Sequence, residues 1–336
     1  MLRFTVITAL ATTCSNSSSQ VEAAVPDALP SDAGIPLAQR ISAATATATS
    51  NDACTAIAPF YWEIGTAGGA LGGGSLPPPL RNTRETAVTA DTEMDIASAS
   101  KWLFGAYVVE RYQDDLTQVD LRAMHMASGY VSLSYPSCTT SDIITMDDCL
   151  NKDDNGVHTA SADDRFDYDG GHFQQYASTA LRLGGADGSA LADAIAGELG
   201  ADIGIAYSSP QLAAGAHMSA TQYARFLRKI LAGQLAISHH LGEAAVCTLP
   251  GRRCPTARYS PALPYAWHYS YGHWVEDDAA TGDGAFSSPG AFGFYPWIDR
   301  SRTYYGVLAR QVRDGYRTSA KCGGLIRLAF EHGVAQ

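Results

Sequence analysis

Two residue types that together support acyl transfer stand three positions apart. Ser98 and Lys101 belong to the run Ser-Ala-Ser-Lys, which precedes an apolar stretch. If this run opens a helix, positions i and i+3 share one face, so the lysine amine lies beside the serine hydroxyl. A desolvated, neutral lysine accepts the serine proton, and free N–H groups at the helix start stabilise an oxyanion. The run is also compatible with an ordinary helix that Ser98 caps.

Two later runs add candidate groups. Tyr168 lies in Phe-Asp-Tyr-Asp-Gly-Gly-His, where a glycine-rich turn before a helix can direct a phenol into a cleft. Further on, Ser288-Pro-Gly290-Ala291 leads into a predicted hairpin. Gly290 would let a ligand approach the backbone closely, and the Ala291 N–H could face that ligand. The alternatives are a packed loop tyrosine, in a chain with 17 tyrosines, and a plain turn before a strand.

The elements that position these residues follow from hydrophobic periodicity. Residues 98–111 and 219–235 are predicted helices, and Ser219 with Gln222 resembles a capping box. Strands and turns are indicated by alternating or β-branched runs and by turn residues. They are predicted at 60–65, 69–76, 292–298 and 303–309, with an aromatic strand signal from Tyr265 onward, a hairpin turn at 299–302 and a terminal helix at 322–332.

The order of these elements predicts an α/β (α+β) fold. We expect an antiparallel sheet flanked by helices, built from both chain ends by residues 51–97 and 263–336. A mostly helical domain, residues 98–262, is expected as an insertion between them.

The first 50 residues have the features of a leader. Met1-Leu2-Arg3 and the short apolar core that follows are typical of a signal segment. The Ser/Ala/Thr-rich stretch up to about residue 50 lacks periodicity and is predicted to be disordered or processed. Cys14 admits a lipoprotein anchor, but Thr13 fits that signal poorly. We therefore expect a secreted or periplasmic protein.

Composition limits the partners of the chain. A net charge of −11 and only four lysines in 336 residues argue against nucleic-acid binding. No apolar run reaches the length of a membrane span. The expected partner is a small-molecule or oligomeric substrate, and the oligomeric state is left open.

Six cysteines remain when Cys14 is set aside, and none forms a zinc-type pair, so no metal site and no cofactor are expected. An even number in an exported chain suggests disulfides. Fifteen pairings are possible, and sequence proximity favours Cys138–Cys149 and Cys247–Cys254. This leaves Cys54 with Cys322, which would join the two chain ends.

The order of the three motifs resembles the serine β-lactamase and penicillin-binding-protein superfamily, in particular its class C-like branch. In that superfamily an S-x-x-K opens the first helix of the helical domain, a tyrosine motif follows, and a Lys/His-x-Gly motif lies on a late strand. The resemblance implies a nucleophile at Ser98, an activating base at Lys101 and a proton shuttle at Tyr168. It also implies an oxyanion hole formed by the N–H groups of Ser98 and Ala291, with substrate contacts at Gly170, Ser288 and Gly290.

Two positions depart from this pattern. Gly170 stands where the tyrosine motif carries asparagine, and Ser288 stands where the third motif carries Lys or His. A missing cation removes a charge-assisted contact with a substrate carboxylate. We therefore expect an esterase or linear-amide hydrolase, similar to the 6-aminohexanoate-oligomer hydrolases. The alternatives are a β-lactamase or D-Ala-D-Ala carboxypeptidase, and a non-catalytic envelope binding protein on the same scaffold.

Overall fold

The computed structural model describes residues 34–78 and 86–336. Its strands are β1 (Phe60–Thr66), β2 (Gly69–Leu76), β3 (Met94–Asp95), β4 (Ser128–Tyr130), β5 (His158–Asp163), β6 (Phe166–Asp167), β7 (Ala206–Tyr207), β8 (Ala216–Met218), β9 (Val246–Cys247), β10 (Ala257–Tyr259), β11 (His268–Tyr269), β12 (Trp274–Glu276), β13 (Ala285–Ser287), β14 (Tyr295–Ile298) and β15 (Tyr305–Ala309).

Its α-helices are α1 (Leu37–Ser50), α2 (Asp52–Thr55), α3 (Ser100–Tyr112), α4 (Gln118–Met124), α5 (Met146–Leu150), α6 (Gly171–Thr179), α7 (Gly188–Leu199), α8 (Ala220–Leu231) and α9 (Tyr316–His332). Short 3₁₀ helices are η1 (Ala97–Ala99), η2 (Gln113–Asp115), η3 (Pro136–Thr139), η4 (Ala201–Ile203) and η5 (Ala236–Ser238).

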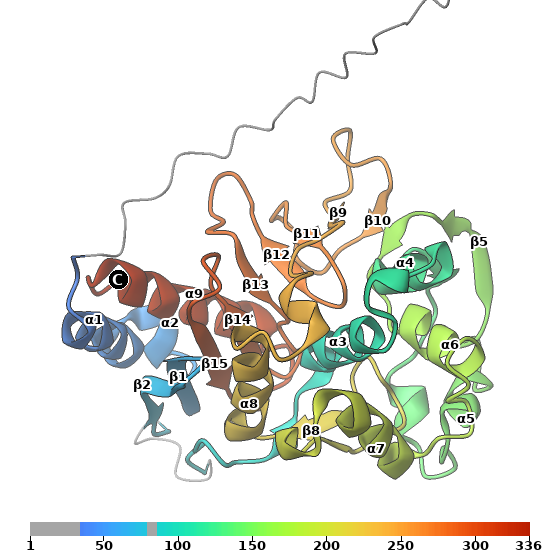
Figure 1. Cartoon of the computed structure of the whole chain (residues 1–336), viewed down its shortest axis with the longest axis horizontal. Coiled ribbons are helices and arrows are strands. Elements are labelled where there is room, and N and C mark those ends of the chain that lie inside the picture. The colour runs from blue at the N-terminus through green and yellow to red at the C-terminus, as the bar shows by residue number, and fades with distance from the viewer. Residues whose placement is uncertain (1–33, 79–85) are drawn as a thin grey trace, which may run out of the picture. The chain divides into compact units, whose positions relative to one another are not determined.

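An antiparallel sheet of eight strands combines strands from the N-terminal and C-terminal parts of the described chain (Figure 1). Its order is β2-β1-β15-β14-β13-β12-β11-β9. Seven of the strands come from the two segments expected to form the sheet, and β9 adds an edge from the segment expected to be helical. The mixed α/β fold with an antiparallel sheet is thus confirmed. Because residues 35–336 form one compact unit, the proposed division into two domains stays a prediction.

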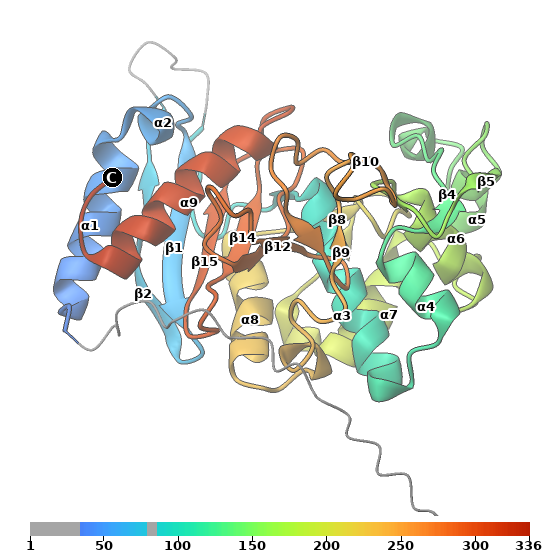
Figure 2. The same ribbon diagram turned by 90° about the horizontal axis from the view of Figure 1, so that it is seen from above.

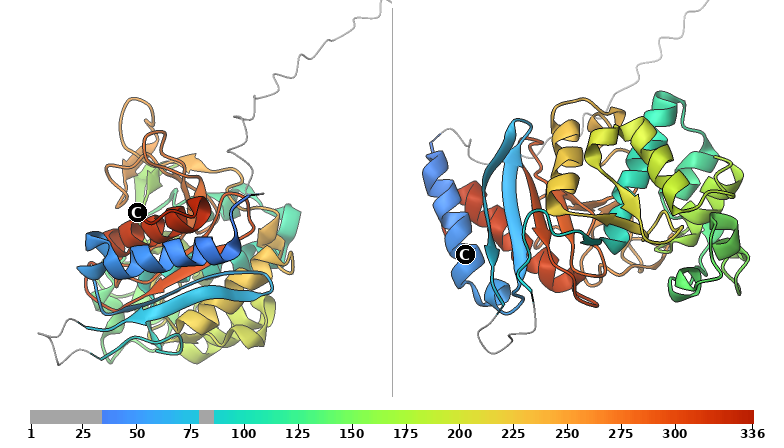
Figure 3. Two further views of the ribbon diagram at one scale, coloured as in Figure 1. Left: turned by 90° about the vertical axis from the view of Figure 1, so that its left-hand side faces the viewer. Right: turned by 90° about the horizontal axis from the view of Figure 1, so that it is seen from below.

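Alternation along the strands gives the sheet two buried faces. Trp62 and Ile64 point to one face, where they join a cluster with residues of α1 and α9. The opposite face, which includes Val307, packs against α8. Figure 3 shows α1 and α9 side by side on one side of the sheet and α8 on the other. In Figure 2, α3 lies among the other helices of the middle of the chain, and its residues Ser100–Val109 are all buried.

The predicted elements differ from the observed ones mainly at their ends. The two N-terminal strands and the turn at 299–302 are confirmed, and the Asp299 carboxylate accepts the N–H groups of Thr303 and Tyr304 at 2.8 and 2.6 Å. The Ser219–Gln222 capping box is also present. Helix α8 ends before 235 because Gly233 has a φ of +66°.

The expectation of a leader up to residue 50 is wrong for its last part. Helix α1 packs against α9, with Ala43, Ala44 and Ala48 buried. Alanine-rich helices approach neighbours closely because their side chains are short, although they lack the bulky periodicity of a typical core helix. The signal segment and Cys14 lie outside the described residues.

All three expected disulfides are present: Cys54–Cys322, Cys138–Cys149 and Cys247–Cys254. The first joins α2 to α9, and the other two close short loops. Within the described ranges, every helix is too short or too polar to cross a lipid bilayer.

Candidate active site

Ser98 lies in η1, immediately before the buried helix α3. The preceding strand β3 pairs with β8, and the Ile96 N–H donates to the Ala216 carbonyl at 3.0 Å. The Ser100 hydroxyl donates to the Ala97 carbonyl at 2.6 Å and accepts the Ala216 N–H at 3.1 Å. Ala97 has a φ of +46°, which is unusual for a residue with a side chain. The surrounding hydrogen bonds hold this conformation directly before Ser98.

Lys101 lies beside the Ser98 hydroxyl, as the spacing in a helix predicts. Its Nζ is 3.0 Å from Ser98 Oγ and 2.9 Å from the Ala213 carbonyl oxygen. The side chain is buried, and burial lowers the pKa of Lys101 to about 7, against a smaller opposing effect of the Asp169 charge. At this pKa a large fraction of the amine is neutral near neutral pH. A neutral amine at this distance can accept the serine proton.

Tyr168 reaches the same site from a distant part of the chain. Tyr168 directly follows strand β6, which pairs in parallel with β10. The Tyr168 N–H donates to the Tyr259 carbonyl at 3.2 Å. Its ring stacks on Trp274 with centroids 5.2 Å apart, and Lys101 Nζ lies 4.8 Å from the ring centroid. Burial raises the pKa of Tyr168 to about 12, although the Ser98 and Trp274 side chains oppose this rise. The phenol is therefore a proton donor at neutral pH.

His172 supports the loop that carries Tyr168. The ring is fully buried, and burial lowers the pKa of His172 to about 4, so it is neutral. With the tautomer assigned from its partners, Nδ1 accepts the Ser128 N–H at 3.1 Å and Nε2 donates to the Asp167 carbonyl at 2.9 Å. The contacts of His172 are those of a buried structural residue.

The two residues after Tyr168 are Asp169 and Gly170, and Gly170 stands where the tyrosine motif has asparagine. Asp169 Oδ1 accepts the N–H groups of Gly171 and Leu133 at 2.7 and 3.1 Å. Burial raises the pKa of Asp169 despite these bonds, and its charge raises the pKa of Lys101. A Cβ on Gly170 would lie 2.8 Å from a Leu133 methyl carbon and 3.1 Å from the Ala213 Cβ. An asparagine has no room there without movement of these neighbours.

The third motif contacts the segment that carries Ser98. The Ser288 hydroxyl donates to the Ser98 carbonyl at 3.0 Å. A Cβ on Gly290 would lie 2.0 Å from the Ile96 carbonyl oxygen. Gly290 therefore allows close approach of the protein's own backbone, and its contact with a ligand stays a prediction. The next N–H, at Ala291, donates to no backbone carbonyl among the described residues, whereas the Ala291 carbonyl accepts the Gly315 N–H.

Ser98 opens into a cavity of about 290 Å³. The residues that line it are Ser98, Tyr168, Tyr259, Pro261, Ala262, Trp267, Trp274, Pro289, Ala291, Asp314 and Tyr316. None of these lining residues is Arg, Lys or His. Ser288, Gly290 and Gly170 are not among the lining residues, and their contacts with a substrate stay a prediction.

The sequence indicates only some of the residues that surround this site. Of the aromatic residues in the C-terminal part of the chain, Trp267 and Trp274 line the cavity, whereas Phe294, Tyr295 and Trp297 are buried in the core. Arg310 donates to the Ile57 carbonyl. The Ala213 carbonyl and the Asp169 carboxylate were missed as neighbours of Lys101. A backbone carbonyl 112 positions away leaves no signal in the residue types.

Comparisons with known proteins support the fold. No protein-family model and no curated protein match the sequence. Among solved structures, a penicillin-binding-protein homologue from Pyrococcus abyssi, described as octameric, is similar with a TM-score of 0.62 and 12% identity, over 90% of this chain and 78% of that one. A β-lactamase from Mycobacterium bovis is similar with a TM-score of 0.51 and 14% identity, over 82% of this chain and 96% of that one. A D-stereospecific amidohydrolase from Streptomyces is similar with a TM-score of 0.52 and 11% identity, over 85% of this chain and 98% of that one. The chain has the fold of the serine β-lactamase and penicillin-binding-protein superfamily.

Proposed function

We propose that the chain is a serine hydrolase that forms a covalent acyl-enzyme on Ser98 and acts on neutral esters or linear amides. The observation that carries this proposal is the pair of Ser98 and Lys101. The serine hydroxyl faces a cavity, and the amine 3.0 Å away has a pKa of about 7. A nucleophile with an adjacent, desolvated base is the arrangement that acyl transfer requires.

The reaction then proceeds in two halves. In the first, neutral Lys101 takes the proton of Ser98, and Oγ bonds to the substrate carbonyl carbon. The N–H groups of Ser98 and Ala291 stabilise the oxyanion. The bond to the leaving group breaks as the Tyr168 phenol donates a proton to it. Lys101 then returns a proton to Tyr168, next to whose ring its Nζ lies.

In the second half, water attacks the acyl-enzyme. One proton of the water passes to the base, the acyl–Oγ bond breaks, and Ser98 regains its proton as the acid leaves. The two halves together add one water across the substrate bond, so no cofactor is consumed.

The cavity favours a neutral acyl group over a carboxylate. Its described lining residues include Trp267, Trp274 and the carboxylate of Asp314, and no cation. Burial of apolar substrate surface there contributes roughly 25 cal/mol per Å², whereas a substrate carboxylate would lack a charge-assisted partner. The likeness to a D-stereospecific amidohydrolase supports an amide substrate. The likeness to a β-lactamase keeps β-lactams and D-Ala-D-Ala peptides as the second candidate class.

The central test measures covalent labelling and turnover together. Wild-type protein is incubated with a p-nitrophenyl ester, nitrocefin and a D-Ala-D-Ala peptide, and its mass and the hydrolysis rates are recorded. We expect an acyl adduct on Ser98 and a higher kcat/KM for the ester than for nitrocefin. Ser98→Ala should lose both adduct and turnover, while the exposed control Ser189→Ala keeps them.

Each other outcome has a definite reading. Hydrolysis that persists in Ser98→Ala rejects the nucleophile. A folded wild-type protein that gains no mass with any of these compounds favours the non-catalytic binding protein. Faster turnover of nitrocefin or of the peptide transfers the assignment to a β-lactamase or a D,D-peptidase.

We also propose that the protein acts outside the cytoplasm. Three disulfides support this, because such bonds persist mainly in oxidising compartments. N-terminal sequencing of protein recovered from the exported fraction tests the proposal. A protein that stays in the cytoplasm with its first residues intact and all seven thiols free contradicts it.

A further inference from the structure

A second cavity adjoins the candidate active site. It has a volume of about 580 Å³ and lies between α9 and the segment 261–267. We call it the α9 cavity. It shares lining residues with the cavity at Ser98, and these are Pro261, Ala262, Trp267, Pro289 and Tyr316. The two cavities therefore adjoin along these residues, and an extended molecule bound at Ser98 lies next to the α9 cavity.

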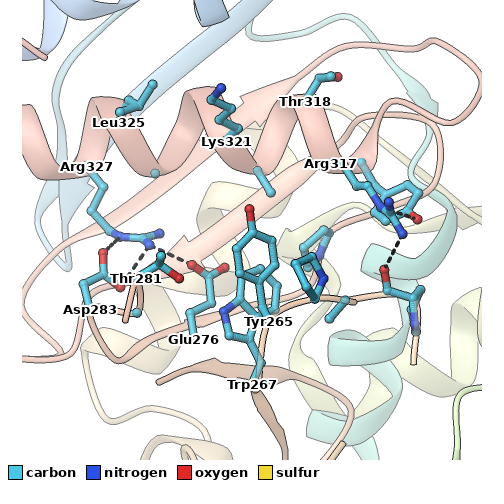
Figure 4. A pocket seen from close by; sticks show the side chains of 18 of the residues that line it. Tyr265, Trp267, Glu276, Thr281, Asp283, Arg317, Thr318, Lys321, Leu325 and Arg327 are labelled. Carbon is cyan, nitrogen blue, oxygen red and sulfur yellow. Dashed lines mark hydrogen bonds and ion pairs between the residues drawn. The ribbon is translucent and has the colours of Figure 1, made fainter. Parts of the chain in front are cut away.

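The wall of the α9 cavity near the active site is aromatic. Tyr265 and Trp267 stack with centroids 5.3 Å apart and ring planes 13° from parallel. Figure 4 shows this pair next to α9, with the Tyr265 hydroxyl directed toward the helix. Tyr265 is 39% exposed and Leu263 is 41% exposed, so large apolar side chains border the opening. An aromatic wall of this kind buries apolar groups of a ligand.

The other end of the cavity holds Arg327, which is already paired with two carboxylates. Arg327 donates to Glu276 at 2.7 Å and to the two oxygens of Asp283 at 2.7 and 3.0 Å. It also donates to the Tyr295 hydroxyl at 2.8 Å, and Figure 4 shows its guanidinium between the two carboxylates. A buried charge whose hydrogen bonds are satisfied gains little from a further polar partner. The end of the cavity at Arg327 therefore does not require a charged group on the ligand.

Helix α9 is attached to the opposite wall where the two cavities meet. Arg317 at its start donates to the Pro261 carbonyl at 3.3 Å and to the Tyr316 hydroxyl at 2.9 Å. Pro261 and Tyr316 line both cavities. These hydrogen bonds fix the boundary that the two cavities share. The volume of the α9 cavity falls within the range of about 300–1,000 Å³ typical of small-molecule sites.

We propose that the α9 cavity is a subsite that receives the apolar end of an extended ester or amide whose carbonyl is attacked by Ser98. This inference rests on the proposed hydrolase function and specifies its substrate as one with an apolar group several atoms from the scissile bond. Each methylene buried in the subsite should raise kcat/KM about fourfold, which corresponds to the usual transfer free energy of a methylene.

Gly324 provides the blocking variant. It lies in α9 and lines the cavity, and a Cβ there would meet no heavy atom nearer than 3.9 Å. Gly324→Phe can therefore fill the space without displacing backbone, and replacing a glycine in a helix does not weaken the helix. Gly197→Phe is the matched control, because Gly197 is an exposed glycine in α7 with nothing within 4 Å of its Cβ position.

The experiment compares two substrate series on the three proteins. One series is p-nitrophenyl esters from acetate to octanoate, and the other is acetate esters of alcohols of rising chain length. We expect kcat/KM to rise with chain length in one series for wild type and Gly197→Phe. Gly324→Phe should hydrolyse the acetate ester with the kcat/KM of wild type, but its kcat/KM should not rise with chain length. Tyr265→Ala removes part of the aromatic wall, so kcat/KM should rise less with chain length in this variant than in wild type.

The proposal is overturned if no series gains with length, or if Gly324→Phe gains as much as wild type. An equal loss on short and long substrates also overturns it, since a subsite affects only molecules long enough to reach it. Acylation of Ser98 by p-nitrophenyl acetate, followed by mass spectrometry, separates the two proposals. An adduct without length dependence rejects only the subsite, whereas no adduct rejects the hydrolase function.

Discussion

The hydroxyl of Ser288 donates a hydrogen bond of 3.0 Å to the backbone carbonyl of Ser98. The Ser288 N–H in turn donates to the Pro296 carbonyl on β14 at 3.3 Å. The side chain at the position of an expected cation therefore connects the sheet to the peptide unit of the proposed nucleophile. Because Ala291 follows three residues later, this bond also fixes the spacing between the two N–H groups of the proposed oxyanion hole.

Ser288→Ala should lower kcat/KM for a short neutral ester about twofold to twelvefold. The reason is the loss of one neutral hydrogen bond, with a net value of about 0.5–1.5 kcal/mol. Ser288→Thr keeps the hydroxyl and should retain more of the activity. Steady-state kinetics on the two variants check this, and an alanine variant as active as wild type would show that the bond does not position the nucleophile.

The pH dependence of turnover should follow Lys101. Its pKa in the folded protein is lowered to about 7, so the ammonium form below that pH cannot accept the Ser98 proton. We expect kcat/KM for a non-ionising ester to rise about tenfold per pH unit below pH 7 and to level off above it. Lys101→Ala should remove the dependence and most of the rate.

Lys229→Ala serves as the control, since Lys229 pairs with Asp202. It should leave the pH profile unchanged. An apparent pKa close to 10.5, the ordinary lysine value, would contradict the lowered pKa of Lys101. An unchanged pH profile in Lys101→Ala would mean that Lys101 is not the base.

Tyr168→Phe should affect substrates according to their leaving groups. The phenol has a pKa of about 12 and stays protonated across the assay range, so it acts as a donor. Alkyl esters and amides need this proton, and their kcat/KM should fall roughly 10²–10⁴-fold, the usual range for general acid catalysis. p-Nitrophenyl esters, whose leaving group departs as a stable anion, should lose much less. Equal losses on both classes, or an equal effect of Tyr304→Phe, would contradict the role of Tyr168 as proton donor.

The disulfides should differ in their contribution to stability according to the length of chain they enclose. Cys54–Cys322 spans 268 positions and Cys138–Cys149 spans 11. The chain-entropy model predicts a loss of about 6 kcal/mol for the long loop and about 3 kcal/mol for the short one. Urea unfolding of the two double alanine variants measures these values. A larger loss for the 138–149 variant would show that local packing outweighs loop entropy.

What the sequence determined about this protein is mostly local. The Ser98–Lys101 contact follows from residues i and i+3 on one turn, and the capping box at Ser219 and the turn at 299–302 follow from hydrogen bonds between residues at most five apart. The two short disulfides are local for the same reason. Such contacts form wherever the backbone adopts the predicted element, so residue types and spacing are sufficient to predict them.

Only the tertiary structure decided the surroundings of these groups. Tyr168 reaches Lys101 because β6 pairs with β10, and Ala213 supplies a carbonyl from 112 positions away. The packing of α1 on α9 depends on the shape of the partner helix, which composition does not record. The α9 cavity likewise exists because distant segments leave space between them. Burial, which lowers the pKa of Lys101 to about 7, is a property of that packing and not of the motif.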